Sequence, residues 1–332
     1  MEHVMNGAGR GQDYLYSAGA SYMVFDLNAA KQKAYQAIYR AQENDQHDII
    51  CLARSLLAQT AFMRGDFKEA TEHITFICDY ITEKNLTPLF DMRESSRNWI
   101  YVKMRDLSKV SSWIFTEYNN PRQPPLTSGA SSIMHAQYLL AAEKFNELIA
   151  FLDPLENMCR KKGIWNGILT AHIMRAVAYS KLDKNDLSMD SFRKAYDISH
   201  QNGIIAPFIE SGGYMRSLVE IARKDERHSF DADWLDLIYR KAFSFSRLYQ
   251  TMVKTYKHEN KTHNNSQNIS LSKRESQVLQ ELANGLTQDQ IASFYGISSG
   301  TVKTHVKSIY NKMGAINRAD AIRIAAEFGL IG

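Results

Sequence analysis

The residues of this chain best suited to chemistry lie on one face of a predicted helix near the C-terminus. Apolar residues there step by four, three and four positions, as Val302, Val306, Ile309 and Met313, so they form one stripe that must be buried. The opposite face carries hydrogen-bond donors and no carboxylate, namely Lys303, Thr304, Lys307, Ser308 and Asn311. No acidic residue occurs between Asp289 and Asp320. A helix with this face has the width and the donors to enter the major groove of DNA.

Four successive helix starts are expected to position this face. Each start has its own capping residue, which is Ser272 (with Glu275), Thr287 (with Gln290), Ser298 or Asn317. Glycines fall just past the predicted ends of the first three helices, at Gly285, Gly296 and Gly314. The second and third helices are separated only by a short turn through Tyr295, Gly296 and Ile297. A turn this short is typical of a helix-turn-helix.

From Leu271 to Glu327 the sequence resembles a LuxR-type DNA-binding domain. The matching pieces are RE…VL, GLT…IA, GIS, TVKTH, KMG and NRADA. The resemblance implies a four-helix domain whose third helix enters the major groove and whose fourth contributes to pairing on two half-sites. Gln290 replaces the usual Glu, which should weaken a helix-supporting interaction, and Tyr295 replaces the usual Leu, which puts a larger ring in the core.

The same resemblance implies roles for individual residues. Lys303, Thr304 and Lys307 should meet base edges, because lysine suits guanine O6 and N7 and threonine can pack on a thymine methyl. Ser308 and Asn311 share that base-reading face. Residues better placed for phosphates are Thr287, Ser298, Thr301, Lys312 and Arg318. As an alternative, Thr287 and Ser298 serve only as caps, and Lys312 and Arg318 are solvated charges.

The long region before this module has helical spacing throughout. Apolar residues recur at three and four positions, as in Leu52, Leu56 and Leu57, and strand alternation is not sustained. A predicted turn, most often Asp before a large apolar residue, recurs at Asp26, Asp66, Asp106, Lys144 and Asp186, in steps of 40, 40, 38 and 42 residues. Asp at such a turn can cap the second helix of a pair. Ala30 and Ala70, four residues further on, would let the two helices approach closely, whereas Asp190 replaces the small residue in the last unit.

This pattern resembles a tetratricopeptide-like array of helical hairpins with an enlarged repeat, over roughly residues 10 to 205. The alternative is an irregular helical domain with evenly spaced turns. Together with the C-terminal module, the array is similar to the C-terminal half of the large ATP-binding LuxR regulators. Their nucleotide-binding domain is missing here, so the chain is expected to be a short relative or a fragment, without switching by ATP.

Composition agrees with a folded, non-enzymatic protein. The 332 residues are 44% hydrophobic and 23% charged, with a net charge of +4, which suits about two globular domains. No phosphate-binding loop, nucleophile motif or metal-ligand spacing occurs, so we expect no cofactor, no metal and no catalysis. The three cysteines are widely spaced, which predicts core or half-buried thiols rather than disulfides or zinc ligands. No export or membrane-spanning segment is evident, so a cytoplasmic protein is expected.

The sequence therefore predicts an all-α bacterial regulator in three parts. Residues 1–256 form a tetratricopeptide-like domain for signal input or interaction, residues 257–270 a polar linker, and residues 271–332 the LuxR-type helix-turn-helix domain. The expected function is sequence-specific binding of double-stranded DNA, as a homodimer and as an activator, with RNA polymerase a possible partner and an unknown protein, peptide or small-molecule effector at the repeats. The alternative is an interaction scaffold whose basic tail holds DNA without choosing a sequence.

Overall fold

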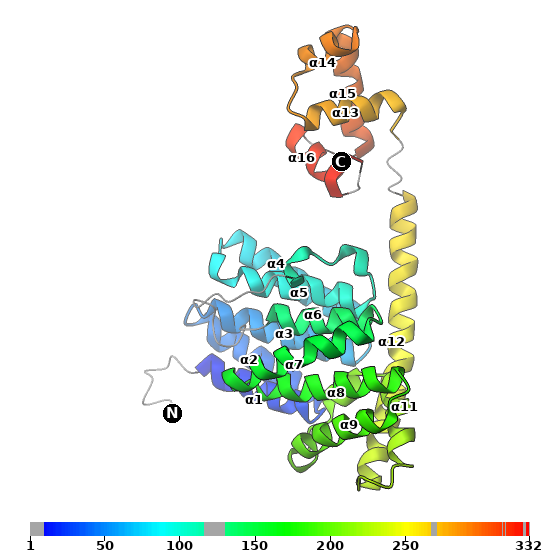
Figure 1. Ribbon diagram of the computed structural model, residues 1–332. Helices are drawn as coiled ribbons and strands as arrows, with labels where there is room; N and C mark the ends of the chain where they lie inside the picture. The colour runs from blue at the N-terminus through cyan, green and yellow to red at the C-terminus, as the bar shows by residue number, and fades with distance from the viewer. Residues whose placement is uncertain are drawn as a thin grey trace. The chain divides into compact units, whose positions relative to one another are not determined.

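The computed structural model describes residues 10–115, 130–266, 271–313, 315, 317–327 and 330–331. These residues form α-helices joined by short turns and a few 3₁₀ turns, with no strand among them, which confirms the all-α prediction. The chain divides into two compact units, residues 1–256 and 257–332. In Figure 1 the helices of the first unit are stacked in successive layers.

The helices that begin in the first unit follow the chain in order. They are α1 Arg10–Met23, α2 Leu27–Gln42, α3 His47–Met63, α4 Phe67–Glu83, α5 Phe90–Lys103, α6 Ala130–Ala141, α7 Phe145–Lys162, α8 Trp165–Lys181, α9 Asn185–Ser199, α10 Ala206–Glu210, α11 Gly213–Ala222 and α12 Ala232–Ser266. The last of these includes residues 257–266, which sequence analysis assigns to the linker. The stretch 232–266 contains neither proline nor glycine, so its polar composition does not interrupt the helix.

Helix ends in the first unit repeat with a strict period. Residues with positive φ occur at 20-residue intervals in two series, first at Phe25, Asp45, Gly65, Asn85 and Arg105 and then at Glu143, Gly163, Asp183 and Gly203. Each one ends a helix in the left-handed conformation, and the next amide bonds back into the helix, as Asp66 N does to Ala61 O at 3.0 Å. Most of these positions are not glycine. The repeat is therefore set by helix length and packing rather than by glycine placement.

The predicted turns agree with this period at most positions. Asp26 and Asp66 cap α2 and α4 by accepting from backbone amides at 3.0 and 2.9 Å. Lys144 directly precedes α7. Asp106 precedes only the 3₁₀ turn Leu107–Lys109, and its side chain makes no cap bond to that turn.

The turn predicted at Asp186 is wrong by two residues. The chain turns at Asp183, α9 begins at Asn185, and Asp186 lies in the first turn of that helix. In the observed register the small residue four positions after the cap is Ser188, which is fully buried, as Ala30 and Ala70 are. The apparent departure at Asp190 therefore disappears.

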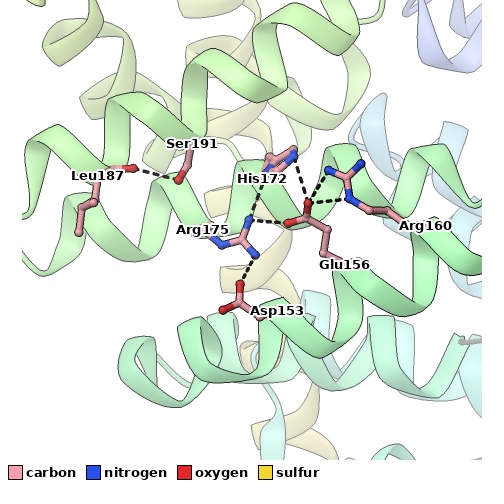
Figure 2. Close-up of polar contacts among 7 residues, drawn as sticks. All are labelled: Asp153, Glu156, Arg160, His172, Arg175, Leu187 and Ser191. Atoms are coloured by element: carbon pink, nitrogen blue, oxygen red, sulfur yellow. Dashed lines mark hydrogen bonds and ion pairs between the residues drawn. The ribbon is translucent and has the colours of Figure 1, made fainter.

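The neighbouring helices α7 and α8 are joined by a partly buried ion network, shown in Figure 2. Arg175 on α8 donates to Glu156 at 2.8 Å and Asp153 at 2.9 Å on α7, and Arg160 also donates to Glu156. The Arg175 guanidinium also contacts His172 Nδ1 at 3.1 Å. Because arginine can only donate, that nitrogen must accept, which keeps the ring neutral. Burial, partly opposed by Glu156, lowers the pKa of His172 to about 4.

We expect His172 to make the first unit sensitive to mild acid. The unfolded chain binds a proton on this histidine near pH 6.5, whereas the folded chain does so only near pH 4. Stability should therefore fall as the pH decreases through this window. Urea unfolding of the His172→Gln variant, followed at several pH values, should show a shallower decline than the wild-type chain. Identical slopes for the two proteins would contradict the prediction.

Gly65 stands out among the turns because a helix packs directly on it. Its φ is +84°, and a Cβ built there would lie 3.3 Å from Leu248 Cδ2 on α12. Gly163 offers a matched control, since its φ is +68° and no atom of the described residues lies within 4 Å of its built Cβ. Gly163→Ala should lower the free energy of unfolding by about 1–2 kcal/mol through backbone strain alone. Gly65→Ala should lower it further, and equal losses in urea unfolding would rule out close packing by α12.

Candidate nucleic-acid interface

The second unit contains four short helices after the end of α12. They are α13 Lys273–Ala283, α14 Gln288–Tyr295, α15 Ser299–Met313 and α16 Arg318–Glu327. The predicted stripe of α15 is buried, with Val302 and Ile309 fully inaccessible. It packs on apolar residues of α13 and α14 such as Val278, Leu282 and Ile291. Burial of this stripe fixes which face of α15 is left for solvent.

The predicted caps position these helices. Both capping boxes form, Ser272 with Glu275 at the start of α13 and Thr287 with Gln290 at the start of α14. Gln290 makes the reciprocal bond, because its side-chain amide oxygen accepts from Thr287 N at 2.8 Å. Ser298 Oγ accepts from Thr301 N at 3.1 Å at the start of α15.

The remaining helix-end predictions also fit where they can be seen. Asn317 Oδ1 accepts from Asp320 N at 2.9 Å, which caps α16. Gly285 and Gly296 are left-handed at the ends of α13 and α14. Gly314 lies outside the described residues.

The donors predicted to read bases are mostly free on the exposed face of α15. Lys303, Thr304, Lys307 and Asn311 are all exposed. Among the described residues neither Lys303 nor Lys307 has an ion-pair partner, while the Thr304 hydroxyl bonds back to Gly300 O at 3.0 Å. The ammonium groups are therefore available to an outside acceptor, and no carboxylate of the described part of this unit competes for them.

Ser308 and Lys312 are instead held by a carboxylate from another helix. Glu275 is buried on α13 and accepts from the Ser308 hydroxyl at 2.6 Å and from Lys312 Nζ at 2.7 Å. It also accepts from Ser272 N. These bonds, led by the one from Lys312, lower the pKa of Glu275 to about 2. We call this group the Glu275 clamp; it ties the exposed face of α15 to the start of α13.

Three further contacts set the packing of the unit. Arg318 donates to the carbonyl of Leu282 at 2.6 Å, at the end of α13. The Arg274 guanidinium stacks 4.3 Å from the centre of the Tyr295 ring. Tyr295, whose ring was predicted to lie in the core, is partly buried against it, and its hydroxyl donates to Glu281 at 3.3 Å. Sequence spacing gave no signal for these contacts, because each joins residues on different helices.

Three of the five residues predicted for phosphate contacts cluster at two helix starts. Thr287 begins α14, and Ser298 and Thr301 lie at the start of α15 with their hydroxyls 2.8 Å apart. All three are exposed. Nearby, the Ser299 hydroxyl donates to Asp289 at 2.6 Å, which links the first turns of the two helices. Helix starts present free backbone amides, so this edge suits anions.

Comparison with known families agrees with both halves of the structure. Residues 269–325 match the luxR family of bacterial regulatory proteins, and residues 19–225 match the MalT-like TPR region. The chain thus belongs to the family with a MalT-like TPR region, and its C-terminal domain is of the luxR type. None of the described helices is long and apolar enough to cross a membrane.

The similar proteins include the HTH-type transcriptional regulators MalT of several bacteria. The one from Cronobacter sakazakii is 22% identical over 303 residues, which cover 86% of this chain and 32% of that protein. The one from Yersinia enterocolitica is 21% identical over 321 residues, covering 90% and 34%. The chain therefore spans about a third of the length of these relatives.

Proposed function

We propose that this protein regulates transcription by binding specific sequences in double-stranded DNA, with α15 in the major groove. The observation that carries the proposal is the face of α15, which is exposed, free of carboxylates and rich in donors opposite a buried stripe. Lysine and threonine at these positions can recognise guanine and thymine edges, and asparagine can recognise adenine. Lys303, Thr304, Lys307 and Asn311 are the proposed readers.

The other residues predicted to contact DNA fall into two groups, those exposed at helix starts and those already bonded to a partner within the unit. Thr287, Ser298 and Thr301 are proposed to bind phosphates at the starts of α14 and α15. Ser308, Lys312 and Arg318 have partners within the unit. We propose that Ser308 and Lys312 act by holding α15 at the angle needed for the groove, and that Arg318 holds α16 against the end of α13.

The remaining parts of the chain are assigned by analogy and composition. We propose that residues 1–256 receive a protein, peptide or small-molecule signal, that the chain around residues 257–270 connects this region to the DNA-binding domain at 271–332, and that two copies bind paired half-sites. The relatives are named transcriptional regulators. A non-enzymatic, cytoplasmic activator that contacts RNA polymerase fits that relationship.

Selection of binding sites from a random pool of duplex DNA tests this function. The full chain should enrich one motif, arranged as two half-sites if it binds as a dimer. The alternative function is a repeat scaffold that holds DNA through charge alone. Retention of the pool without enrichment would support the scaffold and contradict sequence-specific regulation.

A further inference from the structure

The long helix α12 runs along the edge of the stack where the hairpin turns lie (Figure 1). It contacts every second turn of the first series, those at Phe25, Gly65 and Arg105, which are 40 residues apart in the chain. The contacts advance along α12 in the same order. A single rigid helix is thus fastened to three repeats in succession.

The first two attachments are close packing. The ammonium of Lys241 lies 4.7 Å from the centre of the Phe25 ring. Seven residues further along α12, Leu248 packs against Gly65, and the missing side chain of this glycine allows the close approach. Phe62 at the end of α3 also packs edge-on against Phe245 of α12, with ring centres 5.8 Å apart.

The third attachment is made by two tyrosine hydroxyls. Tyr249 donates to the carbonyl of Lys103 at 2.7 Å, and Tyr256 donates to the Asp106 carboxylate at 2.7 Å. The Tyr256 ring also meets Phe67 edge-on, with ring centres 5.7 Å apart. We call this group, Tyr249 and Tyr256 with Lys103 and Asp106, the third-turn latch.

Burial is unequal along α12. Its first half carries five buried apolar side chains, Trp234, Leu235, Ile238, Ala242 and Phe245, whereas only Met252 is buried between residues 246 and 256. Apolar burial dominates the free energy that holds a helix on its neighbours. The segment 246–256 is therefore held by less apolar burial than the first half, and the third-turn latch adds two hydrogen bonds to the contacts of Met252 and the partly buried Val253.

We propose that the third-turn latch is a releasable contact through which the repeats control the DNA-binding unit. Solenoids bend by small rotations between neighbouring repeats. A straight helix fastened at three turns fits one curvature, so a change in curvature must free its most weakly held end. The freed segment leads directly into the DNA-binding unit. The inference rests on the proposed function.

The test removes the latch while keeping its rings. In the full chain, Tyr249→Phe with Tyr256→Phe deletes two hydroxyl donors, and Tyr16→Phe on α1, whose hydroxyl accepts from Gln12, serves as the matched control. Each lost hydrogen bond should speed local opening about fivefold, so amides of 249–256 should exchange about 25-fold faster. Amides of 234–245 should keep their wild-type rates, as should every segment of the control.

The second measurement asks whether release reaches the DNA-binding unit. The double variant should bind the selected DNA with an affinity at least fivefold different from wild type, and the sign would show which state binds. Faster exchange with unchanged affinity would overturn the proposal, as would unchanged exchange. If the wild-type chain selects no DNA, the proposed function fails instead. Small-angle scattering of the full chain then decides, because a profile identical in wild type and double variant overturns the latch.

Discussion

Replacing Glu275 by alanine should unfold most of the DNA-binding unit under conditions where the repeats stay folded. The Glu275 clamp joins α13 to α15 through Ser308 and Lys312 and closes the capping box with Ser272. Hydrogen bonds to a charged group contribute about 1.5–3 kcal/mol, and a lost cap costs about 1 kcal/mol. Lys312 is partly exposed and can turn to water, so we expect a total loss of about 2–4 kcal/mol. A small unit has little stability beyond that.

Amide exchange in the full chain measures this loss, because it reports α13–α15 and the repeats separately. Glu275→Gln should give an intermediate loss, since an amide keeps an acceptor but not the charge. Glu281→Ala is a control on the same helix, where the contacts with the partly exposed Tyr295 and with the exposed Asn284 are removed. If α13–α15 amides were protected equally in Glu275→Ala and wild type, the clamp would not stabilise the unit.

The acid response of the same unit provides a second check on the clamp. The pKa of Glu275 is about 2 in the folded unit, against 4.5 normally. Its contribution to stability is therefore complete above pH 4.5 and is lost as the pH falls toward 2. This window lies below that of His172. Glu275→Gln should remove the lower transition and leave the upper one in place.

Replacing Lys303 or Lys307 by alanine should cost specific DNA binding about 1–3 kcal/mol each, which is roughly 5- to 150-fold in affinity. Both ammonium groups are exposed and lack an internal ion-pair partner among the described residues, so their removal should leave the fold intact. Binding to random DNA should weaken much less, and the salt dependence should change little, because it counts phosphate contacts rather than base contacts. Titrations on the selected site and on random DNA at several salt concentrations measure both.

Lys273 gives the matched control for these substitutions. It is exposed at the first position of α13 and lies off the α15 face. Lys273→Ala should therefore change specific and random binding by similar small factors. If Lys303→Ala and Lys307→Ala also changed specific and random binding by similar factors, α15 would bind phosphates rather than bases. The scaffold alternative would then be preferred.

The sequence by itself determined the features that depend on near neighbours in the chain. Caps such as Ser272 and Thr287 act over three residues, and the stripe from Val302 to Met313 needs only the period of a helix. Both are therefore written in local spacing. The caps made by Asp26 and Asp66, which mark the 40-residue repeat, are local in the same sense, because each acts over three residues.

Where no capping residue marks a helix start, local spacing misleads. The residue at the start of α9 is Lys184, which makes no side-chain cap bond. The nearby Asp186 has the residue type of a cap, so the turn was predicted there, two residues too late. The left-handed turns at Asp45 and Arg105 also lack glycine. At such positions the packing of the neighbouring repeats determines where the helix ends, and the residue type at the turn does not predict it.

Only the tertiary structure decided which donors near the exposed face of α15 are free. Ser308 and Lys312 have the same chemistry as Thr304 and Lys307, yet the first two are bound by Glu275, more than 30 residues away in the chain. The Tyr256 bond to Asp106 spans 150 residues. Contacts of this kind depend on how helices are packed in space, because a side chain's partner is set by distance between atoms and not by distance along the sequence.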